Sequence, residues 1–221
     1  GSSALRANTT GTENVAIGGN AGDALTTGSY NVIIGYLAGT HATNLATGDN
    51  NTIIGSYTDT GAADTDNANA FGADVQGASG YTTVGLGTND IRAAHGNITW
   101  ATVSDERVKK DIEDATVGLA FINDLRPVTF NYKNKGDLPK EFKGYEEGST
   151  EVYKNPKTNH GFIAQEVKTA IDKHSDIKDG FSMWDDDDPA GQQRVGETAV
   201  VPMLVKAIQE LSAEVEALKQ K

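Results

Sequence analysis

The chain has 221 residues, no cysteine and a formal net charge of −12 at pH 7. Its length suits either one large domain or two small ones, each able to bury a core. The negative charge disfavours nucleic acid and anionic membranes as partners, and the lack of cysteine excludes a disulfide framework and thiolate metal sites.

The composition changes near Ser104. Before it lie 17 of the 25 glycines and only two basic residues, whereas 17 basic and 23 acidic residues follow from Ser104 onward. We therefore predict two domains, a repetitive one over 4–98 and a second over 99–221. Residues 1–3 resemble the remnant of an expression tag, are left out of the fold prediction, and lead us to expect more chain upstream. No apolar run reaches membrane-spanning length, so we predict no membrane insertion.

A short motif repeats through the first domain. "NVAIG" at 14–18 recurs as "NVIIG" at 31–35 and "NTIIG" at 51–55, with weaker copies at 69–72 and 82–85. The clear copies start 17 and 20 residues apart, close to the period of stacked solenoid coils. Each copy predicts a short β-branched strand bracketed by Asn and Gly, which tolerate a tight corner. The sequence thus predicts an all-β solenoid that forms a fibre shaft.

About four coils with few large side chains offer little burial within one chain. We therefore expect an oligomer in which Ile and Val stripes of several chains meet on a common axis. No copy is followed by a helical pattern, so the glycines do not match a phosphate-binding loop and no cofactor is expected.

The second domain alternates strand-like and helical patterns, which predicts an α+β fold. "ITWATV" at 98–103 and "VTFNYK" at 128–133 read as strands, and 114–125 reads as a short helix that buries Val117, Phe121 and Leu125. Residues 134–159 read as a long loop, 160–174 as a strand followed by a helix, and 179–202 as a turn-rich hairpin.

The last helix, predicted over 204–221, carries a heptad seam. Its apolar residues follow 4-3-4-3 spacing: Leu204, Ile208, Leu211, Val215 and Leu218. Such a seam packs on another surface, either its own domain or a second chain, and we favour self-association as a coiled coil. The heptad rule alone favours a dimer, so the residues leave two against three chains open.

Ser104 and Lys109 lie close to the predicted domain boundary, and their spacing allows two interpretations. Thr102 with Asp105 matches a capping box, and Ser104 before two acidic residues suits a helix N-terminus. Alternatively, a buried lysine could act as the base for a serine nucleophile. Ser104 follows the Val103 carbonyl directly, so its hydroxyl could attack the peptide bond between them and cut the chain at the domain boundary.

A family resemblance favours the second interpretation. Four features occur in a fixed order over 104–221: "SDERVKKDI", "LAFINDLRPVTFNYK", "HGFIAQEV" and a terminal heptad helix. Together they resemble the endosialidase-type intramolecular chaperone autoprotease domain of bacteriophage tail fibres and tailspikes. The resemblance implies a single-turnover serine endopeptidase with Ser104 as nucleophile, Lys109 as general base and Val103–Ser104 as the scissile bond. Asp105 and Arg107 match the motif positions between them and are expected to orient the loop.

The resemblance also implies how such a chain assembles. Three copies form a homotrimer, the domain registers the upstream β shaft, and cleavage then removes it. The cut would occur in the bacterial host cytoplasm, and the mature fibre would belong to the virion tail and bind a host cell-surface receptor, either glycan or protein. One alternative is a trimeric adhesin tip without enzymatic activity; a carbohydrate-degrading enzyme is disfavoured because the shaft has few aromatic residues.

Four further sites are weaker candidates. Gln165 and Glu166 in "GFIAQEV" could support the dyad, although a structural role is favoured. His160 could join a proton relay. The acidic run 185–188 does not follow a calcium-loop spacing, so no metal is predicted there, and Trp184 is expected to anchor packing.

Overall fold

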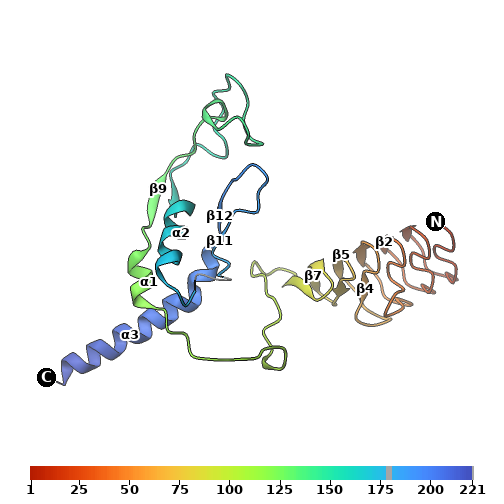
Figure 1. The fold of residues 1–221 in the computed structure, drawn as a ribbon. Helices are drawn as coiled ribbons and strands as arrows, with labels where there is room; N and C mark the ends of the chain where they lie inside the picture. The colour runs from red at the N-terminus through yellow and green to blue at the C-terminus, as the bar shows by residue number, and fades with distance from the viewer. Residues whose placement is uncertain (178–180, 221) are drawn as a thin grey trace. The chain divides into compact units, whose positions relative to one another are not determined.

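The computed structural model describes residues 1–177 and 181–220. It divides into two compact units, Gly1–Asp111 and Ile112–Lys221. Because the relative positions of the two units are not defined, each is described by itself (Figure 1).

The first unit is a β-solenoid of short stacked strands. Each repeat copy forms one strand, and equivalent strands pair in parallel in a six-stranded sheet of order β1-β2-β3-β5-β7-β8. A second, two-stranded parallel sheet joins β4 to β6. The strands are β1 (Val15–Ile17), β2 (Val32–Ile34), β3 (Thr52–Ile54), β4 (Asp59–Thr60), β5 (Asn69–Ala73), β6 (Gln76–Gly77), β7 (Tyr81–Leu86) and β8 (Asn89–Ala94). The predicted strands at all five repeat copies are confirmed.

The core of the solenoid is formed by the middle residue of each strand. Ile33 and Ile53 are fully buried, and Leu25 and Leu45 join them from the opposite side of their coils. Each coil therefore buries part of its own apolar surface, so the expectation that a single chain lacks sufficient burial is corrected for these inner positions. The residues on either side of the middle one point outward.

An asparagine ladder links successive coils. The side chain of Asn31 accepts hydrogen bonds from the backbone and side-chain nitrogens of Asn51, both at 3.0 Å, and donates to Asn14 Oδ1 at 3.1 Å. Both Asn31 and Asn51 are buried, and all their side-chain polar groups are satisfied within the stack. This ladder explains why Asn opens the three clear repeat copies, since no apolar residue can replace its hydrogen bonds.

A stack of glycines turns the corner after each strand. Gly18 and Gly35 have φ values of +135° and +138°, and a Cβ on either would lie within 2.4 Å of the next coil's backbone. Both conformation and close approach therefore require glycine at this position. Gly1 stacks on Gly18 in the same way, and Ser2 O accepts a hydrogen bond from Asn20 N at 2.8 Å. Residues 1–3 thus form part of the first coil.

The parallel stack ends where β8 folds back antiparallel on β7. The strand predicted at 98–103 is wrong: only a single bridge, between Arg92 and Ala101, continues the pairing. The side chain of Ile98 is 97% exposed and that of Trp100 is 50% exposed. Because its apolar side chains are not buried against other described residues, this alternating stretch stays outside the sheet.

The second unit has an α+β fold, as predicted. Its elements are α1 (Leu119–Asp124), β9 (Val128–Phe130), η2 (Lys135–Asp137), β10 (Asn159–Gly161), α2 (Ala164–Lys173), β11 (Trp184–Asp185), β12 (Arg194–Val195), η3 (Glu197–Val200) and α3 (Val201–Lys219). Strands β9 and β10 pair antiparallel around the long loop predicted at 134–159, and β11 pairs with β12 as the predicted hairpin. Residues 179 and 180 at the start of that hairpin prediction lie outside the described residues.

The core of this unit lies among α1, α2 and the start of α3. Phe121, Val167 and Met183 are almost completely buried, and Ala170 and Ile171 pack beside them. The predicted burial of Val117 and Phe121 is confirmed, and Leu125 is partly buried against the same cluster.

Helix α3 is attached to its own unit along one side only. Ala207 is buried, and Glu210 accepts a 2.7 Å hydrogen bond from the Leu119 backbone at the start of α1. The five heptad residues instead remain between 40% and 67% exposed: Leu204, Ile208, Leu211, Val215 and Leu218. Figure 1 shows the helix extending beyond α1 to the C-terminus. Lys221, the last residue of the predicted helix, lies outside the described residues.

Candidate functional site

The candidate site is the stretch that follows the solenoid. The Lys109 ammonium donates a 2.8 Å hydrogen bond to Ser104 Oγ. The residues between them form one turn of 3₁₀ helix, η1 (Glu106–Val108), which folds the chain back so that positions 104 and 109 meet. The structure therefore brings together the two residues that the sequence predicts as nucleophile and base.

An aspartate and an arginine hold this turn. Asp105 caps η1 by accepting a 2.9 Å hydrogen bond from the Arg107 backbone, and its carboxylate also accepts two hydrogen bonds from the Arg107 guanidinium, at 2.9 and 2.6 Å. The guanidinium lowers the pKa of the Asp105 carboxyl, so the pair stays charged. These contacts hold the backbone of η1 in its turn conformation.

The helix-cap interpretation of Ser104 is not supported. Asp105, one residue later, is the cap, while the Thr102 hydroxyl donates to the Asp90 backbone oxygen at 3.2 Å instead of taking part in a capping box. Ser104 Oγ thus accepts its hydrogen bond from Lys109 and does not cap the turn.

The dyad is exposed in the single chain. Both Ser104 and Lys109 are exposed, and so are the apolar side chains of Val103, Val108 and Ile112, which are 59%, 69% and 63% accessible. A lysine becomes a base only in its neutral form, which burial favours. In the single chain Ser104 and Lys109 therefore lack the dry surroundings that a lysine base needs, and apolar side chains are exposed on both sides of them.

Gln165 and Glu166 have a structural arrangement in the second unit. The Glu166 carboxylate accepts two hydrogen bonds from the Arg126 guanidinium, which joins the end of α1 to the first turn of α2. This contact lowers the pKa of Glu166. Gln165 is exposed and contributes its backbone oxygen to the Thr169 hydroxyl. Arg126 was not predicted from sequence, although its place between a helix end and Pro127 indicates a structural corner.

The other candidates also have ordinary structural surroundings. His160 lies exposed in β10. Asp188 accepts a hydrogen bond from the Ala190 backbone and pairs with Arg194 at 2.8 Å, which orders the acidic turn. Trp184 packs against the core and donates to Gln193 Oε1 at 3.1 Å, as a packing anchor does. Within residues 1–177 and 181–220, no cluster of three or more His or acidic side chains is arranged to hold a metal ion.

The chain thus consists of a solenoid of stacked coils followed by a small α+β unit whose last helix exposes an apolar face. The comparison with known families specifies the second part. Residues 104–176 match the family model described as chaperone of endosialidase, which is classed as a peptidase. The chain therefore contains an endosialidase-type chaperone domain, and the match begins at Ser104. No curated protein and no solved structure gave a significant match. None of the described helices is long and apolar enough to cross a membrane.

Proposed function

We propose that this chain is the C-terminal part of a phage tail fibre or tailspike whose chaperone domain trimerises, registers the β shaft and then cuts itself off at Val103–Ser104. The match to the chaperone family supports the chaperone role. The 2.8 Å contact between Lys109 Nζ and Ser104 Oγ is the observation that carries the cleavage step.

The outer face of the solenoid supports assembly of the shaft. One outward-pointing residue of each strand in this sheet stands in register with that of the next strand, which forms a continuous apolar column along the sheet. This column consists of Ile17, Ile34, Ile54, Phe71, Val84 and Ile91. Ile17 is 57% exposed and Val84 40% exposed. An uninterrupted apolar column of this kind is typical of an interface, and three copies would meet along it.

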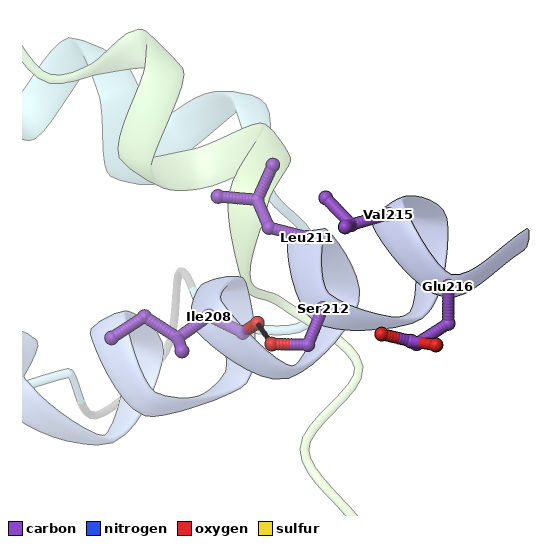
Figure 2. A pocket seen from close by; sticks show the side chains of 5 residues that line it. All are labelled: Ile208, Leu211, Ser212, Val215 and Glu216. Carbon is purple, nitrogen blue, oxygen red and sulfur yellow. Dashed lines mark hydrogen bonds between the residues drawn. The ribbon is translucent and has the colours of Figure 1, made fainter. Parts of the chain in front are cut away.

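Helix α3 supports assembly of the chaperone domain. A shallow, mainly apolar pocket lies on it between Ile208, Leu211, Ser212, Val215 and Glu216 (Figure 2). Knobs from a facing helix fill such holes in a coiled coil. The side of α3 that contacts α1 carries Ala207 and Glu210, and the heptad face, exposed with respect to the described residues, would receive a second and a third copy.

Registering three repetitive chains is the step that needs a chaperone. Coils with nearly identical edges pair well in several registers, and long-range pairing is slow because it closes large loops. A globular trimer at the C-terminus holds the three chain ends together and reduces this entropic barrier. Cleavage afterwards prevents the shaft from unfolding back through its template, which makes the fibre kinetically stable.

In the proposed cleavage, Lys109 in its neutral form takes the proton from Ser104 Oγ as this oxygen attacks the carbonyl carbon of Val103. The C–N bond to Ser104 breaks, its nitrogen takes the proton from Lys109, and an ester joins Val103 to the serine oxygen. Water then hydrolyses the ester and regenerates the hydroxyl. The products are residues 1–103 and 104–221.

The exposure of the dyad indicates when this reaction would run. Contact of Val103, Val108 and Ile112 with neighbouring copies would exclude water from the site and favour the neutral amine. Cleavage would then follow assembly and would not destroy chains that have not yet folded.

The experiment is a time course of self-cleavage on denaturing gels for the purified chain and two variants. Lys109→Ala is expected to stay at full length, whereas Lys110→Ala, an exposed lysine beside it, is expected to be cut like the wild type. Size-exclusion chromatography with light scattering reports the trimer in parallel. A folded wild-type trimer that is never cut would instead favour an adhesin tip without enzymatic activity.

A further inference from the structure

One corner of the solenoid carries bulky residues in a conformation that they rarely adopt. The second residue after each corner glycine has a positive φ, and the four coils place Asn20, Leu37, Tyr57 and Asp74 there, with φ values between +54° and +61°. Asn and Asp tolerate this left-handed conformation well, but a tyrosine is strained in it by about 1 kcal/mol or more. Stability alone would therefore favour Asn over Tyr at position 57.

The strained tyrosine belongs to an exposed aromatic cluster. Its ring meets that of Tyr36 edge to face at 5.6 Å and that of His41 at 4.7 Å. Tyr36 is 50% and Tyr57 40% exposed, and the His41 side chain is 43% exposed. Asp74 lies at the rim, with its carboxylate 3.9 Å from His41 Nδ1. We call these four residues the aromatic corner.

The repeat itself is altered to bring His41 to this corner. The second clear repeat copy is followed by the next after 20 residues instead of 17, and compared with the preceding coil the extra residues fall between Gly39 and Leu45. The carboxylate of Asp59 fixes this insertion by accepting hydrogen bonds from the backbone of Ala42 at 2.6 Å and Thr43 at 2.7 Å.

This anchor is itself costly to bury. Asp59 is only 3% exposed, and burial raises its pKa against the opposing effect of the hydrogen bonds from Thr43 and Ala42. Three features therefore serve the same exposed cluster: the inserted residues, the buried Asp59 carboxylate and the strained Tyr57.

We propose that the aromatic corner binds an uncharged glycan, which makes it a receptor-contact site on the shaft. This inference rests on the proposed role of the chain in a tail fibre. Tyrosine rings offer flat apolar faces on which the C–H groups of a pyranose stack, while the hydroxyl, imidazole and carboxylate groups at the rim match the hydroxyl groups of a sugar. Exposed rings with polar neighbours suit this ligand better than an apolar partner, which would leave Asp74 and His41 without hydrogen-bond partners.

The charge of the shaft selects against anionic glycans. Upstream of Ser104 the chain has eight acidic residues and two basic ones, a difference of −6. Neither Arg6 nor Arg92 belongs to the corner; Arg6 pairs with Asp23, and Arg92 lies over the Tyr81 ring. A sialylated or sulfated chain would thus meet a carboxylate without a compensating lysine or arginine from the described residues upstream of Ser104.

The test measures binding of neutral oligosaccharides of glucose, galactose, mannose and N-acetylglucosamine to the full chain by saturation-transfer NMR and calorimetry. Lactose and sialyllactose form a matched neutral and anionic pair. The informative variant is Tyr57→Asn, because Asn fits the left-handed conformation and keeps the coil folded. Tyr30→Asn is its control, since Tyr30 is equally strained at φ +60° and 54% exposed but lies outside the cluster.

We expect at least one neutral oligosaccharide to bind, Tyr57→Asn to weaken this binding by about tenfold or more, and Tyr30→Asn to change it by less than about twofold. Lactose should bind no more weakly than sialyllactose. The proposal is overturned if no neutral sugar binds at about 10 mM, if Tyr57→Asn binds like the wild type, or if sialyllactose binds more tightly than lactose.

Two parallel readouts separate this proposal from the proposed function. If Tyr57→Asn changes the mass of the assembly in light scattering, the aromatic corner is an interface between copies and not a glycan site. Self-cleavage is measured on the same preparations, so a chain that is cut but binds no sugar refutes only the glycan site, and a chain that binds sugar but stays uncut refutes only the cleavage.

Discussion

Lys109 Nζ lies 2.8 Å from Ser104 Oγ across a single 3₁₀ turn. The turn is held by Asp105, which accepts hydrogen bonds from both the backbone and the guanidinium of Arg107. A local motif of six residues therefore brings Lys109 to Ser104, without help from a distant part of the chain. What the single chain does not provide is burial of these groups.

Loosening the turn should slow cleavage without abolishing it. In Arg107→Ala, Asp105 keeps its backbone hydrogen bond but loses the guanidinium, so Lys109 meets Ser104 in a smaller fraction of conformers. We expect the first-order rate of self-cleavage to fall by about tenfold, with the trimer unchanged. Arg92→Ala, which removes an arginine outside the turn, serves as the control. A rate equal to that of the wild type would show that the pair has no part in positioning.

A charge on the heptad face of α3 should prevent assembly. Ile208 is 62% exposed in the single chain, and Ile208→Lys would place an ammonium group in the proposed coiled-coil core, so we expect the Ser104→Ala chain carrying it to elute as a monomer. Gln209→Lys adds the same charge outside the seam and should leave the assembly intact. Light scattering measures both. Equal masses for the two variants would argue against α3 as the trimer interface.

The asparagine ladder should account for much of the solenoid's stability. Asn31→Ala leaves the backbone and side-chain nitrogens of Asn51 without acceptors in a buried site. We expect the free energy of unfolding to fall by about 2 to 4 kcal/mol, measured by urea denaturation. Asn44→Ala, the same substitution at an exposed position, should change it by less than about 0.5 kcal/mol. Similar losses for both variants would contradict the role of the ladder.

The contact between Arg126 and Glu166 should make the second unit sensitive to acid. The guanidinium lowers the pKa of Glu166, so the folded state binds a proton less readily than the unfolded state. The wild type should therefore be more stable than Glu166→Gln, and this difference should be complete above the Glu pKa of the unfolded chain, about 4.3. The difference is lost as the pH falls through the lower pKa that Glu166 has in the folded chain. Urea midpoints of the two proteins measured between neutral and acidic pH check this. A difference that does not change with pH would exclude the ion pair as its source.

The sequence predicts most of the solenoid because each repeat copy encodes its own coil. Asn for the ladder, β-branched residues for the strand and Gly for the corner stand at fixed spacing, so strands β1, β2 and β3 can be located from the motif alone. The burial of Ile33 and Ile53 within a single chain was missed, since the motif does not show that Leu25 and Leu45 close each coil from the opposite side.

The stretch after the solenoid shows where local patterns fail. "ITWATV" alternates like a strand, yet a strand needs a partner edge, and β8 offers only one bridge to it, at Ala101. Similarly, the spacing of Thr102 and Asp105 suits a capping box, but the Thr102 hydroxyl donates its hydrogen bond to the Asp90 backbone oxygen. In the second unit, the pairing of Glu166 with Arg126 joins residues 40 positions apart, a distance over which no local pattern operates.

The contact between the rings of the aromatic corner could not be predicted from the sequence either. Tyr36 and Tyr57 belong to neighbouring coils and occupy different positions after the corner glycine, so they meet only once the coils are stacked. The extra residues that bring His41 to them appear in sequence merely as a change of period.

The intact mass of the purified wild-type chain tests the central claim most directly. After incubation under conditions where it forms a folded trimer, mass spectrometry should find two fragments, residues 1–103 and 104–221, with serine as the first residue of the second. Ser104→Ala, assembled to the same trimer, should show only the mass of the full chain. A wild-type trimer that retains the full mass, or a cut at any bond other than Val103–Ser104, would contradict the account.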